Sequence, residues 1–224
     1  MRGQHVHITY YMQLNVIFSE GIHFLTDGVH QQLHNAIYFI LRAVPVFSRK
    51  GIKGKVPDSQ LSGGFNNVTP ENFVARDESP MVTGTRAQQL ALYVVFEEPL
   101  AMVSDVPSAY ANEPSFQFIK DVPTAWDATK VLNGTPGEFV TIARQHGNEW
   151  YLGSLTNWTA RDLRVPLSFL GSGRYEAQIY EDTADAEQNP KHVSIRRQNV
   201  QGSDTLTLHL AGGGGCAIRF VSKN

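Results

Sequence analysis

The most regular hydrophobic pattern in the chain lies in "TGTRAQQLALYVVFEEPLAMVSD", residues 83–105. Apolar residues recur every three or four positions over residues 84–98, which predicts an amphipathic helix. Pro99 ends this helix, and the apolar residues 100–104 predict a buried strand that stops at Asp105. A helix packed on a parallel strand that ends in a carboxylate is the repeating unit of an α/β barrel, which needs eight such repeats and about 250 residues.

The second half of the chain shows alternating apolar and polar residues instead. The segment "EFVTIARQHGNEWYLGSLTNW" alternates on both sides of "QHGNE", which predicts a β-hairpin. Further segments at short, regular spacing are typical of an antiparallel β-sandwich, namely "RDLRVPLSFL", "GRYEAQIYED", "KHVSIRRQNV", "DTLTLHLAGG" and "GCAIRFVS". We therefore predict an α/β part over residues 1–130 and an antiparallel β-sandwich over residues 131–224.

Three other segments have weaker patterns. An apolar run predicts one buried strand over residues 36–41. Residues 50–82 are rich in Gly, Pro, Asn and Ser and predict a long loop, which in a compact domain is usually functional or disordered. The segment "SAYANEPSFQFIKDVP" predicts a broken helix with Phe116, Phe118 and Ile119 facing inward.

Composition narrows the class of protein and its partners. The chain has 224 residues, 42% of them hydrophobic, which supports a packed core, and a formal net charge of −2. A near-neutral charge argues against a nucleic-acid or membrane-surface partner, because both favour a basic face. No apolar run is long enough for a transmembrane helix, and the first residues lack the features of a signal peptide. We therefore expect a cytoplasmic chain or one without its true N-terminus.

Several motifs have a structural and a functional interpretation. The segment "AGGGGC" lacks the Lys-Ser/Thr of a phosphate-binding loop and precedes a strand, so we interpret its glycines as turn or bulge residues and Cys216 as a buried, inert thiol. His5 and His7 would share one face of a strand, but no cluster of Cys, Asp or Glu follows, so we predict no metal site. Asp105 is a candidate site residue because it ends a strand, although it could equally cap a turn.

The tryptophans also have a structural and a functional interpretation. Trp126, with Asp127, could form a platform for a sugar ring, but a packing Trp and a turn Asp at the junction of the two parts are the simpler interpretation. Trp150 and Trp158 are interpreted as residues of the sandwich core or rim.

A family resemblance unites these motifs. The helix "TRAQQLALYVV", the turn "VPSAY", the junction "VPTAWDATKV" and the hairpin "GNEWYLGSLTNW" occur in the order found in glycoside hydrolase family 97, and the resemblance covers residues 60–222. Members are bacterial α-glucosidases and α-galactosidases that act on α-linked oligosaccharides. The resemblance implies an N-terminal β-supersandwich, a catalytic (β/α)8 barrel and a C-terminal β-sandwich associated with oligomerisation. It thus implies that this chain holds an incomplete barrel, consisting of the last repeats, followed by the sandwich.

The resemblance also suggests site residues. "FSEG" matches the family's "WSEG", which makes Glu20 the candidate general acid, and "HNAIYFILR" matches a strand motif that includes His34 and Arg42. His34 and Asp105 are the candidate substrate-binding residues. The family binds calcium beside its site, but Leu14 stands where a calcium-ligating Glu is expected, so we do not expect this chain to bind the ion. For the intact bacterial enzyme, the resemblance implies a periplasmic or secreted location.

Two functions remain open at this point. Glycoside hydrolysis needs two carboxylates that flank the bond, and the partner of Glu20 would lie in barrel segments outside this chain. The first hypothesis is therefore a fragment of an α-glycosidase that is inactive by itself and can form a homo-oligomer through its sandwich. The alternative is a non-catalytic β-sandwich module for oligomerisation or carbohydrate binding.

Overall fold

The computed structural model of the protein describes residues 59–75, 80–96 and 100–223. The first part contains strands β1 (Ser59–Ser62), β2 (Asn67–Val68), β3 (Val82–Thr83) and β4 (Leu100–Val103) and helices α3 (Arg86–Val95) and α4 (Phe116–Asp121). The second part contains strands β5 (Ala128–Thr135), β6 (Phe139–His146), β7 (Glu149–Thr156), β8 (Arg161–Pro166), β9 (Arg174–Asp182), β10 (Val193–Gln201), β11 (Thr205–Leu210) and β12 (Gly215–Lys223). Short 3-10 turns lie at Pro70–Asn72, Pro107–Tyr110 and Ser168–Leu170.

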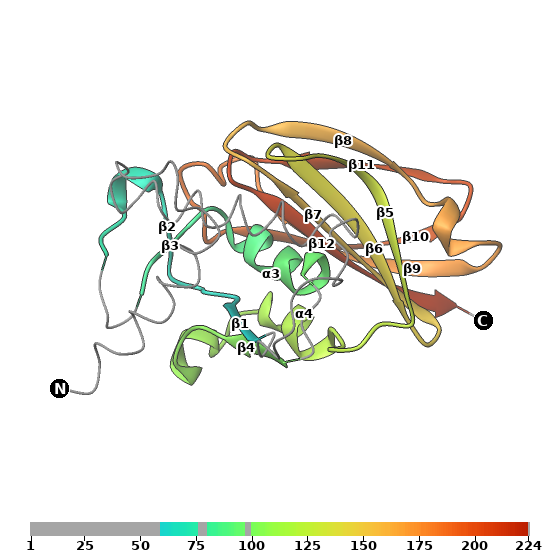
Figure 1. Ribbon diagram of the computed structural model, residues 1–224, viewed down its shortest axis with the longest axis horizontal. Coiled ribbons are helices and arrows are strands. Elements are labelled where there is room, and N and C mark those ends of the chain that lie inside the picture. The colour runs from blue at the N-terminus through green and yellow to red at the C-terminus, as the bar shows by residue number, and fades with distance from the viewer. Residues whose placement is uncertain (1–58, 76–79, 97–99, 224) are drawn as a thin grey trace, which may run out of the picture.

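A six-stranded antiparallel sheet forms the centre of the described structure. Its strand order is β10-β9-β12-β7-β6-β5, so the last strand of the chain is inserted between β7 and β9. The antiparallel pair β8–β11 covers one face of this sheet, and α3 and α4 lie on the other (Figure 1). The predicted antiparallel β-sandwich is thus confirmed, and helices form a third layer against it.

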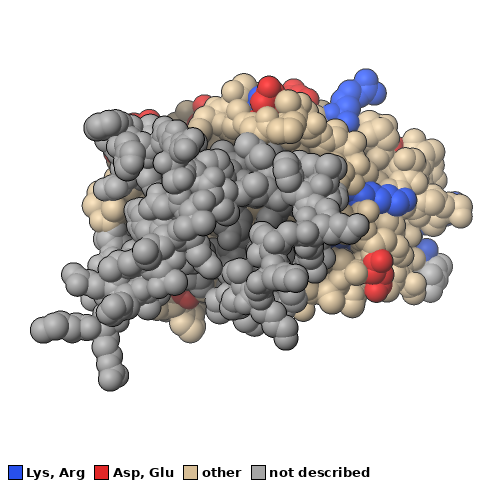
Figure 2. Space-filling view, in the orientation of Figure 1, with Lys and Arg blue, Asp and Glu red and all other residues tan. Residues whose placement is uncertain are grey.

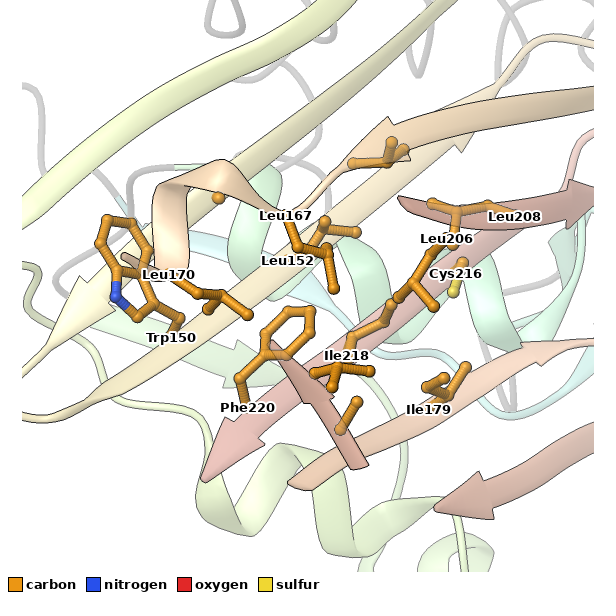
Figure 3. Close-up of a cluster of buried hydrophobic side chains, with 14 of the residues drawn as sticks. Trp150, Leu152, Leu167, Leu170, Ile179, Leu206, Leu208, Cys216, Ile218 and Phe220 are labelled. Atoms are coloured by element: carbon orange, nitrogen blue, oxygen red, sulfur yellow. The ribbon is translucent and has the colours of Figure 1, made fainter. Parts of the chain in front are cut away.

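The core between the two sheets explains the alternating sequence pattern. In β8 and β11 the residues that face the large sheet are apolar and buried, whereas their neighbours are exposed. These side chains meet apolar residues of β7, β9 and β12, and Figure 3 shows the centre of this cluster. Its labelled members are Trp150, Leu152, Leu167, Leu170, Ile179, Leu206, Leu208, Cys216, Ile218 and Phe220. Burial of this apolar area is the main stabilising term for the sandwich.

A second core joins α3 to the opposite face of the sheet. Leu90, Ala91 and Val94 of α3 have no exposed surface. The helix can approach β7 closely because Gly153 has no side chain: a Cβ atom there would lie 2.7 Å from the Ala91 carbonyl oxygen. From α4, Phe118 is buried in the same cluster, while Phe116 and Ile119 pack against it, as the sequence predicted.

Both ends of α3 are bound by groups on the sandwich side. At its start, the Thr85 amide donates to the Gly213 carbonyl (3.0 Å) and the Thr85 hydroxyl accepts from the Gln88 amide (3.1 Å). At its end, the guanidinium of buried Arg144 on β6 donates to the Val94 carbonyl (2.6 Å) and the Val95 carbonyl (3.2 Å). These are carbonyls that a helix leaves without intrahelical partners, and a cation is favoured there by the helix dipole.

The α/β part of the prediction is only partly tested. The predicted helix and the strand before Asp105 are present as α3 and β4, and β4 pairs in parallel with β1 in a two-stranded sheet. This β1–α3–β4 unit is not a barrel, so the incomplete barrel remains a prediction. The division at residue 130 also remains one. The predicted strand over 36–41, Glu20 and His34 lie outside the described residues.

Four strands, β1, β2, β3 and β5, were missed by the sequence analysis. Residues 50–82 were expected to be a long loop, yet the described part of this segment contains β1, β2 and β3. "SQLS" has a single apolar residue, so no hydrophobic pattern marks it, and the backbone pairing with β4 defines the strand. β5 was missed too, because it is an edge strand with mostly exposed or half-buried residues and a register shift between Val131 and Asn133.

On the described part of the face shown in Figure 2, charged side chains do not gather in one patch. Lys and Arg side chains are scattered among other residues there, next to separate Asp and Glu side chains. No helix within 59–75, 80–96 and 100–223 is long and apolar enough to cross a membrane.

Candidate functional site

Asp105 lies where β1 and β4 end, at the carboxyl edge of the parallel pair. One of its carboxylate oxygens, Oδ2, accepts a hydrogen bond from the Phe65 amide (2.5 Å), so the carboxylate joins the segments that follow the two strands. The Asp105 amide donates to the Tyr110 hydroxyl (2.8 Å), and that hydroxyl donates to the Gly63 carbonyl (3.1 Å). We call Gly63, Phe65, Asp105 and Tyr110 the carboxyl-edge cluster.

Aromatic rings enclose one side of the carboxyl-edge cluster. Tyr110 stacks on Phe116 with ring centroids 4.5 Å apart, and Phe65 meets Tyr110 edge-on at 4.9 Å. Burial raises the pKa of the Tyr110 hydroxyl, so Tyr110 acts as a hydrogen-bond donor and not as a base. The half-buried Asp105 side chain is thus held in a fixed position, which is the requirement for a residue that orients a ligand.

Arg86, the first residue of α3, contacts the carboxyl-edge cluster through Phe65. It is 4% exposed, and its guanidinium donates to the Phe65 carbonyl (2.7 Å) and to Glu113 Oε2 (2.7 Å). The guanidinium also lies 4.5 Å from the centroid of the Phe65 ring. Because Glu113 is bound to Arg86, it is a structural carboxylate, and we assign Arg86 to positioning Phe65 rather than to chemistry.

A glycine loop over residues 211–215 forms the boundary between the helix layer and the sandwich. Buried Asp182 holds it: Oδ2 accepts from the amides of Ala211 and Gly215, both at 2.9 Å. A Cβ atom at Gly84, Gly214 or Gly215 would collide with backbone or with the Asp182 carboxylate. The glycines are therefore required for close approach, which agrees with their interpretation as turn residues.

A charged cluster joins the end of α4 to the sheet. The Arg219 guanidinium contacts Glu149 Oε1 and Asp121 Oδ2, each at 2.8 Å, and the Tyr151 hydroxyl donates to Glu149 Oε2 (2.7 Å). Burial by itself raises the pKa of Glu149, but the hydrogen bonds from Arg219 and Tyr151 outweigh it and hold that pKa below its ordinary value. The cluster is an interlayer contact with all of these charges paired.

The carboxyl-edge cluster does not by itself contain the pair of groups that glycoside hydrolysis requires. The carboxyl-edge cluster offers one carboxylate, whereas glycoside hydrolysis uses two that flank the bond. The calcium implied by the family resemblance finds no ligand set here either: in the described ranges, no three His, Cys, Asp or Glu side chains gather to hold a metal. Whether Glu20 or His34 completes a site lies outside these ranges.

The tryptophans divide between core and surface. Trp126 packs edge-on against Tyr151 with ring centroids 5.5 Å apart, and the Asp127 carboxylate accepts from the Gly147 amide in the β6–β7 turn (2.7 Å). The interpretation of this pair as a packing Trp and a turn Asp is confirmed. Trp150 is 5% exposed in the core, whereas Trp158, after β7, is 42% exposed.

Comparison with known proteins identifies the sandwich. Residues 125–221 match the family described as "Glycosyl-hydrolase 97 C-terminal, oligomerisation". The predicted resemblance to the C-terminal part of glycoside hydrolase family 97 is confirmed. A solved family 97 enzyme from Pseudoalteromonas sp. strain K8, in complex with panose, is 43% identical with a TM-score of 0.62, and the match covers 63% of this chain and 23% of that one.

Curated relatives agree with this family 97 match. A retaining alpha-galactosidase of Bacteroides thetaiotaomicron is 40% identical over 165 residues, which are 73% of this chain and 25% of the relative. A probable retaining alpha-galactosidase of Streptomyces bingchenggensis is 33% identical over 155 residues, 69% of this chain and 23% of the relative. The chain thus spans about a quarter of the length of the curated relatives it matches.

Sequence reasoning selected Asp105 as a candidate, which stays a prediction, but did not single out three buried charged residues elsewhere in the described structure. Arg86, Asp182 and Arg144 lie in or beside apolar segments and are nearly buried, and each contacts backbone groups far away in the sequence. A charged residue within an apolar stretch was the available signal, because charges are buried only when they are paired or hydrogen-bonded.

Proposed function

We propose that this chain is the C-terminal part of a family 97 α-glycosidase that acts on α-linked galactosides or glucosides. The observation that carries the proposal is the packing of the β1–α3–β4 unit on the sandwich through α3, together with 43% identity to a solved family 97 enzyme over 63% of this chain. A sandwich that packs directly on a β–α–β unit is suited to support the last barrel repeats of an enzyme.

In the proposed reaction the chain supplies some of the catalytic groups. Glu20 is the general acid that protonates the leaving oxygen, and His34 and Asp105 bind hydroxyl groups of the sugar. Asp105 Oδ2 accepts from the Phe65 amide, and Oδ1 is the oxygen proposed to accept a hydroxyl. The second catalytic carboxylate and the calcium ligands belong to other barrel segments. The 224-residue chain by itself is therefore inactive, since loss of one member of the pair removes the charge stabilisation and the positioned nucleophile or base.

Release of p-nitrophenol from its α-galactoside and α-glucoside tests this proposal. The 224-residue chain should release none above the buffer rate. A chimera that joins it to the preceding three quarters of the Bacteroides relative should be active, and Asp105→Ala should raise the KM of that chimera more than it lowers kcat. Activity of the chain alone that disappears in Glu20→Gln would overturn the proposed inactivity, and an unchanged KM in Asp105→Ala would overturn the role of Asp105.

The alternative, a module that joins subunits without catalysis, is favoured by the description of the matched family as an oligomerisation domain. Light scattering of the 224-residue chain tests the oligomerisation role, because it distinguishes an oligomer from a monomer. We expect self-association at high protein concentration. If the chain is a monomer at every protein concentration and the chimera is active, the oligomerisation role is refuted and the proposed enzymatic function is retained.

A further inference from the structure

Strand β10 is an open edge of the large sheet. It is one of the two outermost strands of that sheet, and within the described ranges it pairs only with β9. The pairing continues over all nine residues of β10, from Val193 to Gln201, without a register shift. The outer side of β10 therefore presents backbone groups that can continue a sheet.

The hydrogen bonds at the end of β10 show which of its backbone groups point outward. The Gln201 amide donates to Asp204 Oδ2 (2.9 Å), and the Gln201 carbonyl accepts from the Asp204 amide (3.0 Å). Both backbone groups of Gln201 thus point away from Arg174, its partner on β9. Because this direction alternates along an antiparallel strand, the amide and carbonyl of every second residue back to Val193 also point away from β9.

The middle of this edge carries an exposed apolar side chain. Residues 201–204 form the turn that leads to β11, so the free part of the edge is residues 193–199. Ile195 lies within this part, and its side chain is 44% exposed. It is the apolar member of the exposed residues of β10, which are Ile195, Arg197, Asn199 and Gln201.

Carboxylates of β9 balance the positive charge of β10. Arg196 Nε lies 2.6 Å from Glu181 Oε1, and Arg197 Nη1 lies 3.5 Å from Glu176 Oε1. Each guanidinium thus has its own carboxylate within the same chain. Because the charges are paired in this way, a second strand with the same sequence can approach the edge without strong repulsion.

The other strand edges of the described structure are shorter or carry features that discourage pairing. β5, at the opposite edge of the large sheet, has a register shift between Val131 and Asn133, and Gly134 follows it. β8 ends in Pro166, and apart from this proline the exposed side chains of β8 and β11 are polar or charged. Strands β1 to β4 have four residues or fewer. β10 is therefore the long regular edge without such protection.

Two copies of β10 can pair with each other in antiparallel orientation about a two-fold axis. With the axis at Ile195, the two Ile195 side chains meet, and Val193 lies opposite Arg197 of the second copy. With the axis at Arg197, two guanidinium groups would lie opposite each other. Apolar residues directly opposite stabilise such a pair and like charges destabilise it, so the axis at Ile195 is favoured.

We propose that β10 joins two copies of this chain by antiparallel pairing centred on Ile195, which makes one continuous sheet across the dimer. The inference rests on the proposed oligomerisation role, and it names the surface that this role uses. The segment that matches the oligomerisation family, residues 125–221, contains all of β10. Stable interfaces bury about 1,200–2,000 Å², and one strand edge is a smaller contact, so the dimer is weak and depends on protein concentration.

Sedimentation velocity of the 224-residue chain over a series of protein concentrations tests the proposal. We expect a monomer–dimer equilibrium. Ile195→Lys should raise the Kd of the dimer about tenfold or more, because it places two ammonium groups opposite each other. Val131→Lys is the matched control, since Val131 on edge strand β5 is 46% exposed against 44% for Ile195, and it should dimerise like the unmodified chain.

Chemical cross-linking tests the register of the two strands. The Cα atoms of opposite residues in an antiparallel pair lie about 4.5–5.5 Å apart, so a short bis-maleimide should join two copies of Ile195→Cys into a covalent dimer. Val131→Cys should give no such dimer, and the native Cys216 is buried. Circular dichroism checks that each variant folds; if Ile195→Lys does not fold, the cross-linking of Ile195→Cys decides.

Three results would overturn the proposed surface. The first is an unchanged Kd in folded Ile195→Lys. The second is the absence of a covalent dimer of Ile195→Cys at concentrations at which the chain dimerises. The third is a weaker dimer in Val131→Lys alone, which would assign the contact to β5. In each case the chain still self-associates, so the oligomerisation role is retained and the role of β10 is refuted. A chain that is a monomer at every concentration refutes both, while the chimera assay decides the enzymatic function separately.

Discussion

Replacement of Asp182 by Asn tests the energetic role of the buried carboxylate at the glycine loop. Asp182 is 8% exposed, and its Oδ2 accepts two backbone amides, whereas its buried Oδ1 has no hydrogen-bond partner among the described residues. Burial raises the pKa of this carboxyl to about 6, and the hydrogen bonds from Thr85, Ala211 and Gly215 offset only part of that effect. The charged form is thus penalised in the folded protein.

The sign and size of the pH effect follow from this pKa. Between pH 4 and 6 the folded state holds a proton that the unfolded state has lost, so the free energy of unfolding falls as the pH rises through this window and is level above it. Raising the pKa from its ordinary value of 3.8 to about 6, at about 1.4 kcal/mol per pH unit, gives about 3 kcal/mol. Asp182→Asn is neutral at every pH, and its amide oxygen can accept the same two backbone amides.

Urea unfolding of both proteins at several pH values from 4 to 7 measures the effect. The free energy of unfolding of the unmodified chain, minus that of Asp182→Asn, should increase by about 2.4 kcal/mol on going from pH 7 to pH 4, which is most of the full effect. Other groups, such as Glu149 with its lowered pKa, contribute equally to both proteins and cancel in this difference. Thr207→Ala, exposed on β11, removes no ionisable group and is the control. Parallel profiles for the unmodified chain and Asp182→Asn would refute the argument that burial penalises this charge.

Three further predictions concern the helix layer and the core. Arg144→Ala leaves the last carbonyls of α3 without their donor, so the free energy of unfolding should fall by about 3 kcal/mol in urea titrations. The stability of Arg144→Lys should lie between those of the unmodified chain and Arg144→Ala. Equal stability of all three proteins would contradict the capping role. Gly153→Ala places a Cβ against the α3 backbone and should cost about 2 kcal/mol, against no measurable change in Thr207→Ala. Burial raises the pKa of the Cys216 thiol, so a thiol-specific disulfide reagent should modify the chain in urea but not when it is folded; rapid reaction of the folded protein would show that this part of the core opens.

Local patterns in the sequence were enough for most of the sandwich and for α3. Alternation in "RDLRVP" and "TLTLHL" reflects one buried and one exposed face, and this relation holds whatever the strands pair with. The helix was recognisable because its apolar residues recur at helical spacing, and the structure adds that Thr85 caps its start. β1 and β5 were not recognisable, because their strand conformation depends on the partners β4 and β6 and not on their own hydrophobic pattern.

The candidate site shows the same division. Asp105 could be selected as a strand-end carboxylate, but the role of its Oδ2 depends on an amide 40 positions earlier in the chain. Arg86 and Asp182 could not be assigned from sequence, because a charged residue is paired by whatever the fold brings beside it. The sequence did not decide whether Trp158 belongs to the core or to the rim, and its 42% exposure in the structure assigns it to the rim.

By itself, the sequence determined α3 and most strands of the sandwich, the antiparallel character of the second half and the resemblance to family 97, because periodicity and motif order are local properties of the chain. Only the tertiary structure decided that α3 packs on the large sheet, that Gly153 and Gly215 permit this approach, and that buried charges bind backbone groups. These contacts join residues tens of positions apart, and their energies depend on burial and distance, which a linear pattern does not contain.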